Sequence, residues 1–229
     1  MSFEDLYIAL KEKEGRKLKP AQIQRLPELP KGHPWTKEWE YRKQTLSRFD
    51  EYLKHRSFYK AVEIFCGTGW FSNWLADRVP HVIGQDILRY ELDIGANIFA
   101  RSNLNLVFTE DIIGLIEKER PDLVVLNSSL QYFNPNSNFL MDVKDALPPD
   151  CEIHIMDTPI YLSEKAAFNA RYKQKVYLNK LGFPEMHNHC FQYEINNLVY
   201  VDWLYTPPMG LNKLLKPKAS PYPWGRIRT

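Results

Sequence analysis

The chain has 229 residues, of which 44% are hydrophobic and 25% charged, and its net charge is +2. These values describe a soluble globular chain with one domain and an extension, or at most two small domains, and they exclude a disordered or fibrous protein. No apolar run reaches the roughly 18 residues that span a bilayer, and the acidic N-terminus lacks the pattern of a secretory signal. Three scattered cysteines exclude a disulfide framework or a zinc cluster as the organising principle. We therefore expect a cytoplasmic protein without a bound metal.

Charge is distributed unevenly along the chain. Residues 1–60 carry 14 Lys and Arg against 9 Asp and Glu, residues 61–206 carry 11 against 19, and residues 207–229 carry 5 against none. A nucleic-acid-binding protein normally presents a concentrated basic face with aromatic residues among it, and the acidic middle of this chain is the opposite. We expect neither a nucleic acid nor a membrane as a partner, and we expect the basic ends to lie on the acidic body or in solvent. The sequence carries no signal for an oligomeric state.

The first 58 residues are predicted to form a helical extension. Apolar residues recur at helical spacing from Phe3 to Leu10, prolines then interrupt the chain, and Thr36 is a candidate cap for a helix from about Lys37 to Arg56. The apolar positions are too few and too interrupted to close a core of their own. We therefore expect this extension to pack against the rest of the chain.

From residue 59 the sequence changes to short apolar runs that alternate with longer amphipathic stretches. This alternation is typical of strands and crossover helices in a parallel sheet with helices on both faces. Predicted strands lie at 61–66, 81–86, 104–111, 121–129 and 151–157, and predicted helices lie at 71–78, 91–101, 112–120, 138–147 and 163–181.

Two further β-like runs, 187–195 and 198–205, follow the last of these helices. Asn196-Asn197 separates them, and because asparagine tolerates positive φ, the pair predicts a tight antiparallel hairpin that closes the sheet. The core therefore spans 59–206. The basic segment 207–229 is too rich in proline to form another helical layer, and we expect it to be a tail.

A glycine-rich turn follows the first predicted strand. Gly67-Thr68-Gly69 stands between that strand and a helix, where glycines let the backbone approach a ligand and the helix N-terminus directs free N–H groups at it. Asp86 ends the next strand, and an acid there is placed to accept hydrogen bonds from two ribose hydroxyls. Glu63 within the first strand and Asp111 at the end of the third complete a pattern that a simple tight turn does not explain.

The residues around the turn favour a nucleoside with a cationic group over a dinucleotide. The dinucleotide fingerprint requires a third small residue, which Ser72 meets only loosely, and the bulky Trp70 and Phe71 crowd the place of a pyrophosphate. Glu63 adds a negative charge that would repel a diphosphate.

These residues resemble the motifs of the class I S-adenosylmethionine-dependent methyltransferases. VEIFCGTGWF is similar to their first motif, in which an acid precedes a glycine-rich turn, GQDI to their second and TEDI to their third. SSLQY is similar to the fourth motif of poorly characterised bacterial members, whereas Phe65 stands where many members have their first glycine. The resemblance covers about residues 59–206. It implies a Rossmann-like, three-layer α/β/α fold with a doubly wound seven-stranded sheet whose last strand is antiparallel, here with an N-terminal helical extension.

The resemblance also implies S-adenosyl-L-methionine as the cofactor and assigns residues to it. Gly67 and Gly69 would approach its methionine part, and Asp86 would bind its ribose. Asp111 would take the adenine amino group, and Asn127 the methionine ammonium through its backbone. The cofactor-binding residues implied in this way are Glu63, Phe65, Gly67, Thr68, Gly69, Asp86, Ile87, Asp111, Ile112 and Asn127.

Methyl transfer is an in-line displacement at a carbon that its sulfonium already activates, so positioning and exclusion of water can supply most of the catalysis. The resemblance implies acceptor contacts from the ends of strands four and five, from the segment before the sixth strand and from the extension 1–58, which we predict to be a lid over the acceptor site. The candidate catalytic residues are Gln131, Tyr132 and Asp157, and further candidate contacts are His33, Trp35, Trp39 and Tyr161.

Three of these positions, and His154 in addition, have a structural explanation as an alternative to a role in the site. Ile87 and Ile112 would sandwich the adenine ring, or they belong to the ordinary core. Tyr132 contacts the acceptor, or it is a plain aromatic wall. His154 stands in the middle of a predicted strand, and we expect an interior histidine with satisfied nitrogens rather than a base.

The fourth motif lacks the Asn/Asp-Pro-Pro-Tyr/Phe tetrad of enzymes that methylate exocyclic amines, and no cysteine has the Pro-Cys setting of a cytosine-5 nucleophile. We therefore predict an enzyme that methylates oxygen or nitrogen of a small-molecule or glycan acceptor. Two alternatives are a non-catalytic module that kept the cofactor-binding fold as a scaffold and an RNA methyltransferase that uses its basic ends as an arm.

Overall fold

The computed structural model describes residues 2–208, 215 and 218–229. In this part of the chain the α-helices are α1 (Phe3–Lys13), α2 (Pro20–Ile23), α3 (Thr36–Leu53), α4 (Trp70–Leu75), α5 (Arg89–Ile98), α6 (Ile112–Glu119), α7 (Phe139–Ala146) and α8 (Glu164–Leu181). Short 3-10 helices are η1 (Leu130–Tyr132), η2 (Pro184–His189) and η3 (Ile195–Leu198). The strands are β1 (Lys60–Ile64), β2 (His81–Asp86), β3 (Leu104–Phe108), β4 (Leu123–Asn127), β5 (Glu152–Met156), β6 (Ile160–Tyr161), β7 (Tyr193–Glu194), β8 (Asp202–Tyr205) and β9 (Trp224–Arg228).

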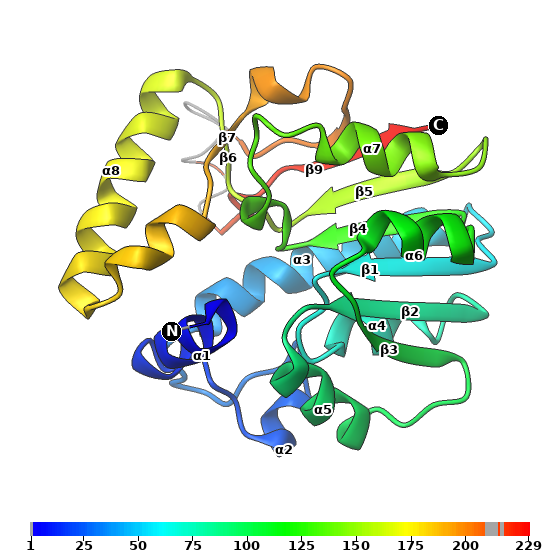
Figure 1. Cartoon of the computed structure of the whole chain (residues 1–229), viewed down its shortest axis with the longest axis horizontal. Coiled ribbons are helices and arrows are strands. Elements are labelled where there is room, and N and C mark those ends of the chain that lie inside the picture. The colour runs from blue at the N-terminus through cyan, green and yellow to red at the C-terminus, as the bar shows by residue number, and fades with distance from the viewer. Residues whose placement is uncertain (1, 209–214, 216–217) are drawn as a thin grey trace.

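A seven-stranded sheet forms the centre of the described chain (Figure 1). Its strand order is β3-β2-β1-β4-β5-β9-β8. Strands β1 to β5 run parallel to one another, whereas β9 is antiparallel to both β5 and β8. The winding reverses between β1 and β4, so the sheet is doubly wound. The expected seven-stranded sheet with its last strand antiparallel is confirmed.

The closing part of the sheet differs from the prediction. Asn196 and Asn197 do not form a hairpin turn but lie in η3, where Asn197 Oδ1 accepts the backbone N–H of Glu194 at 2.9 Å. An asparagine side chain can satisfy a nearby backbone donor in this way, so the pair closes a 3-10 turn. β7 pairs with β6 in a separate small sheet, and β8 pairs with β9. The sheet therefore continues into 207–229, the segment predicted as a tail.

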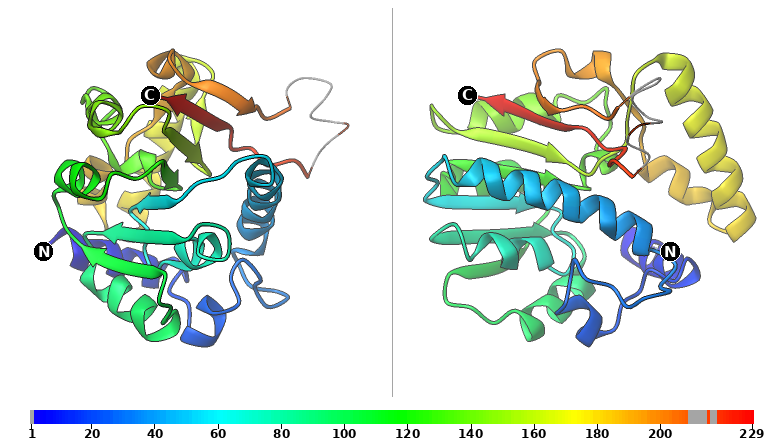
Figure 2. Two further views of the ribbon diagram at one scale, coloured as in Figure 1. Left: turned by 90° about the vertical axis from the view of Figure 1, so that its right-hand side faces the viewer. Right: turned by 180° about the vertical axis from the view of Figure 1, so that it is seen from behind.

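Side chains of the sheet alternate between two hydrophobic cores, one on each face. In β4, Val124 and Leu126 pack in the core that includes α6 and α7, whereas Leu123 and Val125 pack in the core that includes α3 and α4. Figure 2 shows α3 along one face of the sheet and α6 and α7 along the other. Helices on both faces give the expected three-layer architecture.

The N-terminal extension packs against the body at two places. Phe49 of α3 is fully buried beside Phe71 of α4, so α3 is part of one helical layer. Leu6 and Leu10 of α1 pack with Leu178 of α8, and α1 lies beyond the carboxyl ends of the strands (Figure 1). Among the helices of the described residues, none combines the length and apolar character needed to cross a membrane.

Candidate functional site

A cavity of about 200 Å³ opens at the carboxyl ends of the central strands. β1 and β4 are neighbours in the sheet, but their outgoing connections diverge, and ligands of open α/β sheets bind at such a switch point. One side is lined by residues that end β1, β2 and β4 or follow them, in the segments 65–68, 86–88 and 127–132. Residues of the N-terminal extension line the other side.

The chain adopts a left-handed backbone conformation after three neighbouring strands. Phe65 follows β1 with φ 57°, Ser128 follows β4 with φ 60°, and Asp157 follows β5 with φ 50°. Residues other than glycine rarely adopt this conformation, and such strain concentrates at functional sites. Phe65 and Ser128 line the cavity, so two of these sharp turns form its wall.

Gly67 and Gly69 have different roles in the turn after β1. Both have positive φ, 57° and 72°, which favours glycine. A Cβ at Gly67 would meet nothing closer than Glu91 Oε2 at 3.8 Å, so Gly67 leaves its backbone open to the cavity that it lines. A Cβ at Gly69 would lie 2.7 Å from Leu106 Cδ2. Gly69 therefore allows α4 to pack against β3, and it lies outside the cavity lining.

Asp86 is buried beneath the glycine turn. Its Oδ2 accepts the backbone N–H of Gly67 at 2.6 Å, and its Oδ1 accepts those of Ile87 and Leu88 at 2.7 and 2.9 Å. Burial raises the pKa of Asp86 to about 6, although these donors favour the charged form. A carboxylate has about four lone pairs, so this rigidly held group can still accept a hydrogen bond from a ligand in the cavity that it lines.

Glu63 and Asn127 form a buried polar pair in the cavity wall. Glu63 Oε2 accepts the hydroxyl of Ser72, and the nearby Asn127 side chain opposes the rise in the pKa of Glu63. Burial raises the pKa of Glu63 to about 8. Asn127 Oδ1 is buried and has no hydrogen-bond partner among the described residues. An unpartnered buried acceptor is costly, so both groups suit a ligand with a cationic N–H donor.

Aromatic residues from the extension and the body meet across the cavity. Tyr7 of α1 packs edge-on against Tyr132 in η1, and their ring centroids are 6.0 Å apart. Trp39 of α3 packs edge-on against Trp70 of α4 at 5.1 Å between centroids. All four side chains line the cavity and give it an apolar wall.

Arg42 of α3 reaches the turn after β4. Its Nη2 donates to Glu38 Oε1 at 2.8 Å and to Ser128 Oγ at 3.1 Å. Burial opposes ionisation of Glu38, but Arg42 and Arg16 hold the pKa of Glu38 below its ordinary value. Arg42 Nε is buried without a hydrogen-bond partner in residues 2–208 and the other described positions. This guanidinium therefore retains a donor for a polar group in the cavity.

The predicted catalytic residues occupy different places. Gln131 and Tyr132 line the cavity, and Asp157 does not. Gln131 Nε2 donates to the Ser128 carbonyl at 2.6 Å and its Oε1 accepts the Thr158 hydroxyl at 3.1 Å, so this side chain fixes the turn after β4. Asp157 is buried and accepts a hydroxyl of α3 at 2.6 Å, so it joins β5 to that helix.

Some predicted ligand contacts also lie outside the cavity lining. β3 ends at Phe108, and Asp111 is the N-cap of α6, where its Oδ1 accepts the N–H of Gly114 at 2.9 Å. Ile112 is buried in the hydrophobic core, and Tyr161 lies in β6. The other predicted positions in the cavity wall are Glu63, Phe65, Gly67, Thr68, Asp86, Ile87, Asn127, His33, Trp35 and Trp39.

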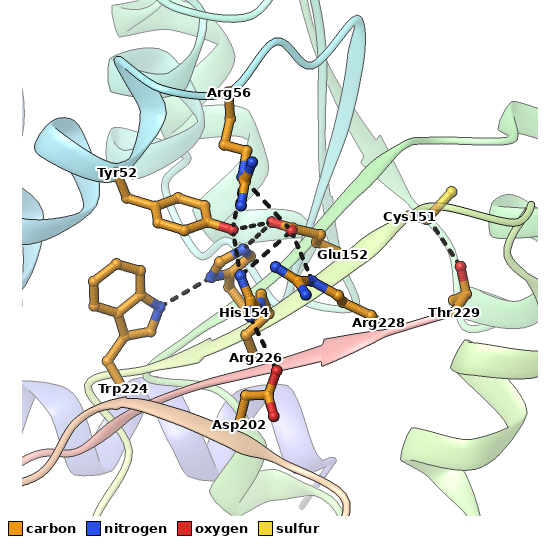
Figure 3. Close-up of polar contacts among 10 residues, drawn as sticks. All are labelled: Tyr52, Arg56, Cys151, Glu152, His154, Asp202, Trp224, Arg226, Arg228 and Thr229. Atoms are coloured by element: carbon orange, nitrogen blue, oxygen red, sulfur yellow. Dashed lines mark hydrogen bonds and ion pairs between the residues drawn. The ribbon is translucent and has the colours of Figure 1, made fainter.

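His154 lies in β5 among a network of polar side chains (Figure 3). Trp224 Nε1 donates to His154 Nδ1 at 2.9 Å, so Nε2 carries the proton and donates to Glu152 Oε2 at 3.1 Å. Burial lowers the pKa of His154. Both ring nitrogens are satisfied, and the expectation of an interior histidine is confirmed.

Local sequence patterns do not predict the cavity residue Tyr7 of α1, the charged residues of α3 or Glu91 of α5. Tyr7, Glu38, Arg42 and Glu91 all line the cavity. Lys11 Nζ pairs with Glu91 Oε1 at 2.8 Å across 80 positions of sequence. Such contacts depend on how the extension folds back over the sheet, and local spacing carries no signal for them.

No protein-family model matches the chain, and no curated protein sequence matches it. Solved structures match its fold. The S-adenosylmethionine-dependent methyltransferase of Anabaena variabilis aligns with a TM-score of 0.57 at 14% identity, over 100% of this chain and 95% of that chain. The fold is that of the class I methyltransferases.

Two further structures of this fold contain S-adenosylhomocysteine. The magnesium protoporphyrin IX methyltransferase of Synechocystis aligns with a TM-score of 0.57 at 12% identity, over 95% of this chain and 94% of that chain. The N-methyltransferase NodS of Bradyrhizobium japonicum aligns with a TM-score of 0.50 at 13% identity, over 91% of this chain and 97% of that chain.

The cavity residues fit S-adenosylmethionine, which carries a sulfonium, an ammonium and ribose hydroxyls. Glu63 and the unpartnered Asn127 Oδ1 suit cationic groups, Asp86 suits hydroxyl donors, and Gly67 leaves room for close approach. The basic side chains that line the cavity, Lys11, Arg16, Lys17 and Arg42, each pair with an acid of the chain. Across the described positions, no cluster of three or more His, Cys, Asp or Glu that could hold a metal ion is present.

Proposed function

We propose that this protein is an S-adenosylmethionine-dependent methyltransferase that methylates oxygen or nitrogen of a small-molecule or glycan acceptor. The observation that carries the proposal is the cavity at the switch point of a class I methyltransferase sheet, where Glu63, Asp86 and Asn127 line one space and Asn127 Oδ1 has no partner among the described residues. When bound, the cofactor supplies a methyl group on a positively charged sulfur. A lone pair of the acceptor can attack the methyl carbon in line, and the sulfur leaves as a neutral thioether.

The residues at the strand ends would bind and orient the cofactor. Asp86 would accept hydrogen bonds from the ribose, since three backbone donors hold it rigidly in place. Glu63 and Asn127 would take the ammonium end of the methionine part. Gln131 would act as a positioning residue, because both ends of its amide are used to fix the turn after β4.

The acceptor would lie between that turn and the N-terminal extension. Tyr7, Tyr132 and Trp39 supply apolar surface that excludes water, and Arg42 supplies a donor that orients a polar group. Burial raises the pKa of both Tyr7 and Tyr132, so these phenols stay neutral and serve as donors rather than bases. Positioning and dehydration therefore supply the proposed catalysis.

Calorimetric titration with S-adenosylmethionine and S-adenosylhomocysteine tests the first half of the proposal. We expect both to bind, and absence of binding would favour the non-catalytic scaffold. Transfer of labelled methyl from the cofactor to pools of small metabolites, glycans and bulk RNA tests the second half. Label in RNA, with salt-dependent binding, would replace the proposed acceptor class.

A further inference from the structure

Helix α8 has apolar side chains on two opposite faces. Ala167 and Leu178 are buried on its inner face. Phe168 and Tyr172 are each 65% exposed and Val176 is 50% exposed. Because these three follow one another at intervals of four residues, they form a stripe along one side of the helix. We call Phe168, Tyr172 and Val176 the outer stripe.

The outer stripe is unusual for a helix that already buries one face. The second face of such a helix is normally polar, because it meets water. Single exposed apolar residues need no explanation, whereas adjoining ones mark an interaction surface. α8 lies at the periphery of the molecule, away from the central sheet (Figures 1 and 2), so the described chain leaves this side of the helix open.

Basic residues flank the outer stripe on both sides. On a helix of 3.6 residues per turn, Arg171 and Lys175 lie along one side of the stripe. Lys165 and Lys173 lie along the other side, Lys180 continues the line of the stripe at the next interval of four residues, and all five residues are exposed. None of the five pairs with an acid among the described residues. Glu164 in the first turn is the acid that α8 contributes.

We propose that the outer stripe and its flanking cations bind the surface of an anionic lipid bilayer, with α8 lying in the plane of that surface. A helix with an apolar stripe between rows of Lys and Arg inserts the stripe at the headgroup boundary while the cations contact lipid phosphates. The basic residues lie on both sides of the outer stripe, so a planar anionic surface that meets the stripe contacts both rows at once. An acidic groove in a protein or a nucleic-acid backbone would favour one continuous basic face.

This proposal revises the expectation of no membrane partner. That expectation rested on the lack of a long apolar run, which is the signal for a spanning helix. A peripheral contact requires spacing of three or four residues instead, and the outer stripe has it. The proposal does not depend on methyl transfer, and its test needs no enzyme activity.

Vesicle flotation of the full chain tests it, with vesicles of phosphatidylcholine alone and of equal parts phosphatidylcholine and phosphatidylglycerol. We expect binding to the anionic vesicles at low salt and little binding to the neutral ones. Replacement of the outer stripe by serine should abolish the binding. Lys165→Gln, Lys173→Gln and Lys175→Gln together should weaken it by about a hundredfold, because each cation near an anionic surface contributes about fivefold.

Matched controls use exposed residues elsewhere. Tyr59→Ser with Val199→Ser removes apolar side chains that are 63% and 83% exposed, and Lys54→Gln with Lys118→Gln removes exposed cations. Both variants should bind as the parent does. Failure of the parent to bind anionic vesicles, or equal loss in the controls, would overturn the proposal. So would stripe-dependent binding of bulk RNA in preference to vesicles, or stripe-dependent dimerisation in sedimentation, since these assign the face to another occupant.

Discussion

Glu63 and Glu152 are both buried glutamates of the same sheet, one near the carboxyl end of β1 and the other at the start of β5. Burial raises the pKa of Glu63 from 4.5 to about 8. Burial would raise that of Glu152 as well, but hydrogen bonds from His154 and Tyr52 and the charge of Arg226 lower it to about 2. The pKa values of these two glutamates are therefore shifted in opposite directions, although both lie in the same sheet.

The difference lies in the partners. Glu152 accepts the Tyr52 hydroxyl at 2.5 Å, and Arg226 and Arg228 lie 3.6 and 3.5 Å from its Oε1 (Figure 3). The groups that act on Glu63 are a hydroxyl, an amide and another carboxylate, so no cation among them balances its charge. Glu152 finds all its partners within the chain, so its role is structural: it connects α3, β5 and β9. A buried acid without a cation marks a place where a ligand can supply one.

The largest expected effect is on stability, from Glu152→Ala. The variant leaves Arg226, Arg228 and the His154 N–H without their shared acceptor, and removal of one partner from a buried ion pair costs about 3 kcal/mol. Urea unfolding should show this loss, while cofactor binding stays unchanged in the folded variant. Glu51→Ala is the control, because Glu51 pairs with Lys54 on the surface and exposed pairs contribute about 0.5 kcal/mol. Equal losses in the two variants would refute the structural role.

The low pKa of Glu152 also fixes a pH dependence. Its folded value of about 2 lies below the ordinary 4.5, so the unfolded chain binds the proton more readily. The contribution of Glu152 to stability is therefore complete above pH 4.5 and disappears as the pH falls toward 2. The difference in unfolding free energy between the parent and Glu152→Gln should shrink over this window. A difference that is constant with pH would contradict the assignment.

The next effect is on affinity, from Asp86→Ala. Loss of a charged acceptor leaves two ribose hydroxyls without partners, which costs about 1.5–3 kcal/mol, or about tenfold to a hundredfold in the affinity for S-adenosylmethionine. Calorimetric titration measures it. Asp93→Ala removes the same charge from an exposed position of α5 and should bind as the parent does. Parental affinity in Asp86→Ala would remove Asp86 from the cofactor site.

The sequence predicts the sheet from β1 to β5 and the helices between its strands because each is specified locally. Strands such as β4 are apolar along their whole length, as burial on both faces requires. α8 is capped at its start by Ser163, whose hydroxyl accepts the N–H of Ala166, and at its end by Gly182 with φ 87°. Both boundaries follow from ordinary capping chemistry.

The sequence does not predict β9 because its partners are distant. The strand follows a proline-rich segment and contains Arg226 and Arg228, so its local pattern is that of a basic tail. In the structure Arg226 is buried beside Glu152, and Trp224 donates to His154 across 70 positions. The same reason applies to the site: residues at strand ends and the aromatic Trp39 of α3 are predictable, whereas Tyr7 of α1 and the charged residues of α3 are not.

A smaller effect is expected from the proton on Glu63. A bound cation favours the charged carboxylate, so binding of S-adenosylmethionine should lower the pKa of Glu63 from about 8 and release protons. Affinity should therefore rise with pH up to about 8 and level off above it. Calorimetric titrations between pH 7 and pH 8, in buffers of different ionisation enthalpy, count the protons. Glu63→Gln keeps the shape of the side chain and should release none, and unchanged proton release in this variant would assign the proton to another group.

The smallest expected effect is on proteolysis. It tests whether a bound ligand protects the chain near Glu63 and leaves the chain near Glu152 unprotected. Tryptic cleavage after Arg25 and Lys31 opens the segment between α2 and α3, and residues of this segment line the cavity. If the extension closes over the bound product, its local opening becomes rarer and cleavage there should slow about threefold with S-adenosylhomocysteine. Cleavage after Lys54, which lies at the end of α3 nearer the Glu152 network, should not change. An equal slowing at both places would indicate general stabilisation of the fold, and no slowing after Lys31 would mean that the extension is not a lid.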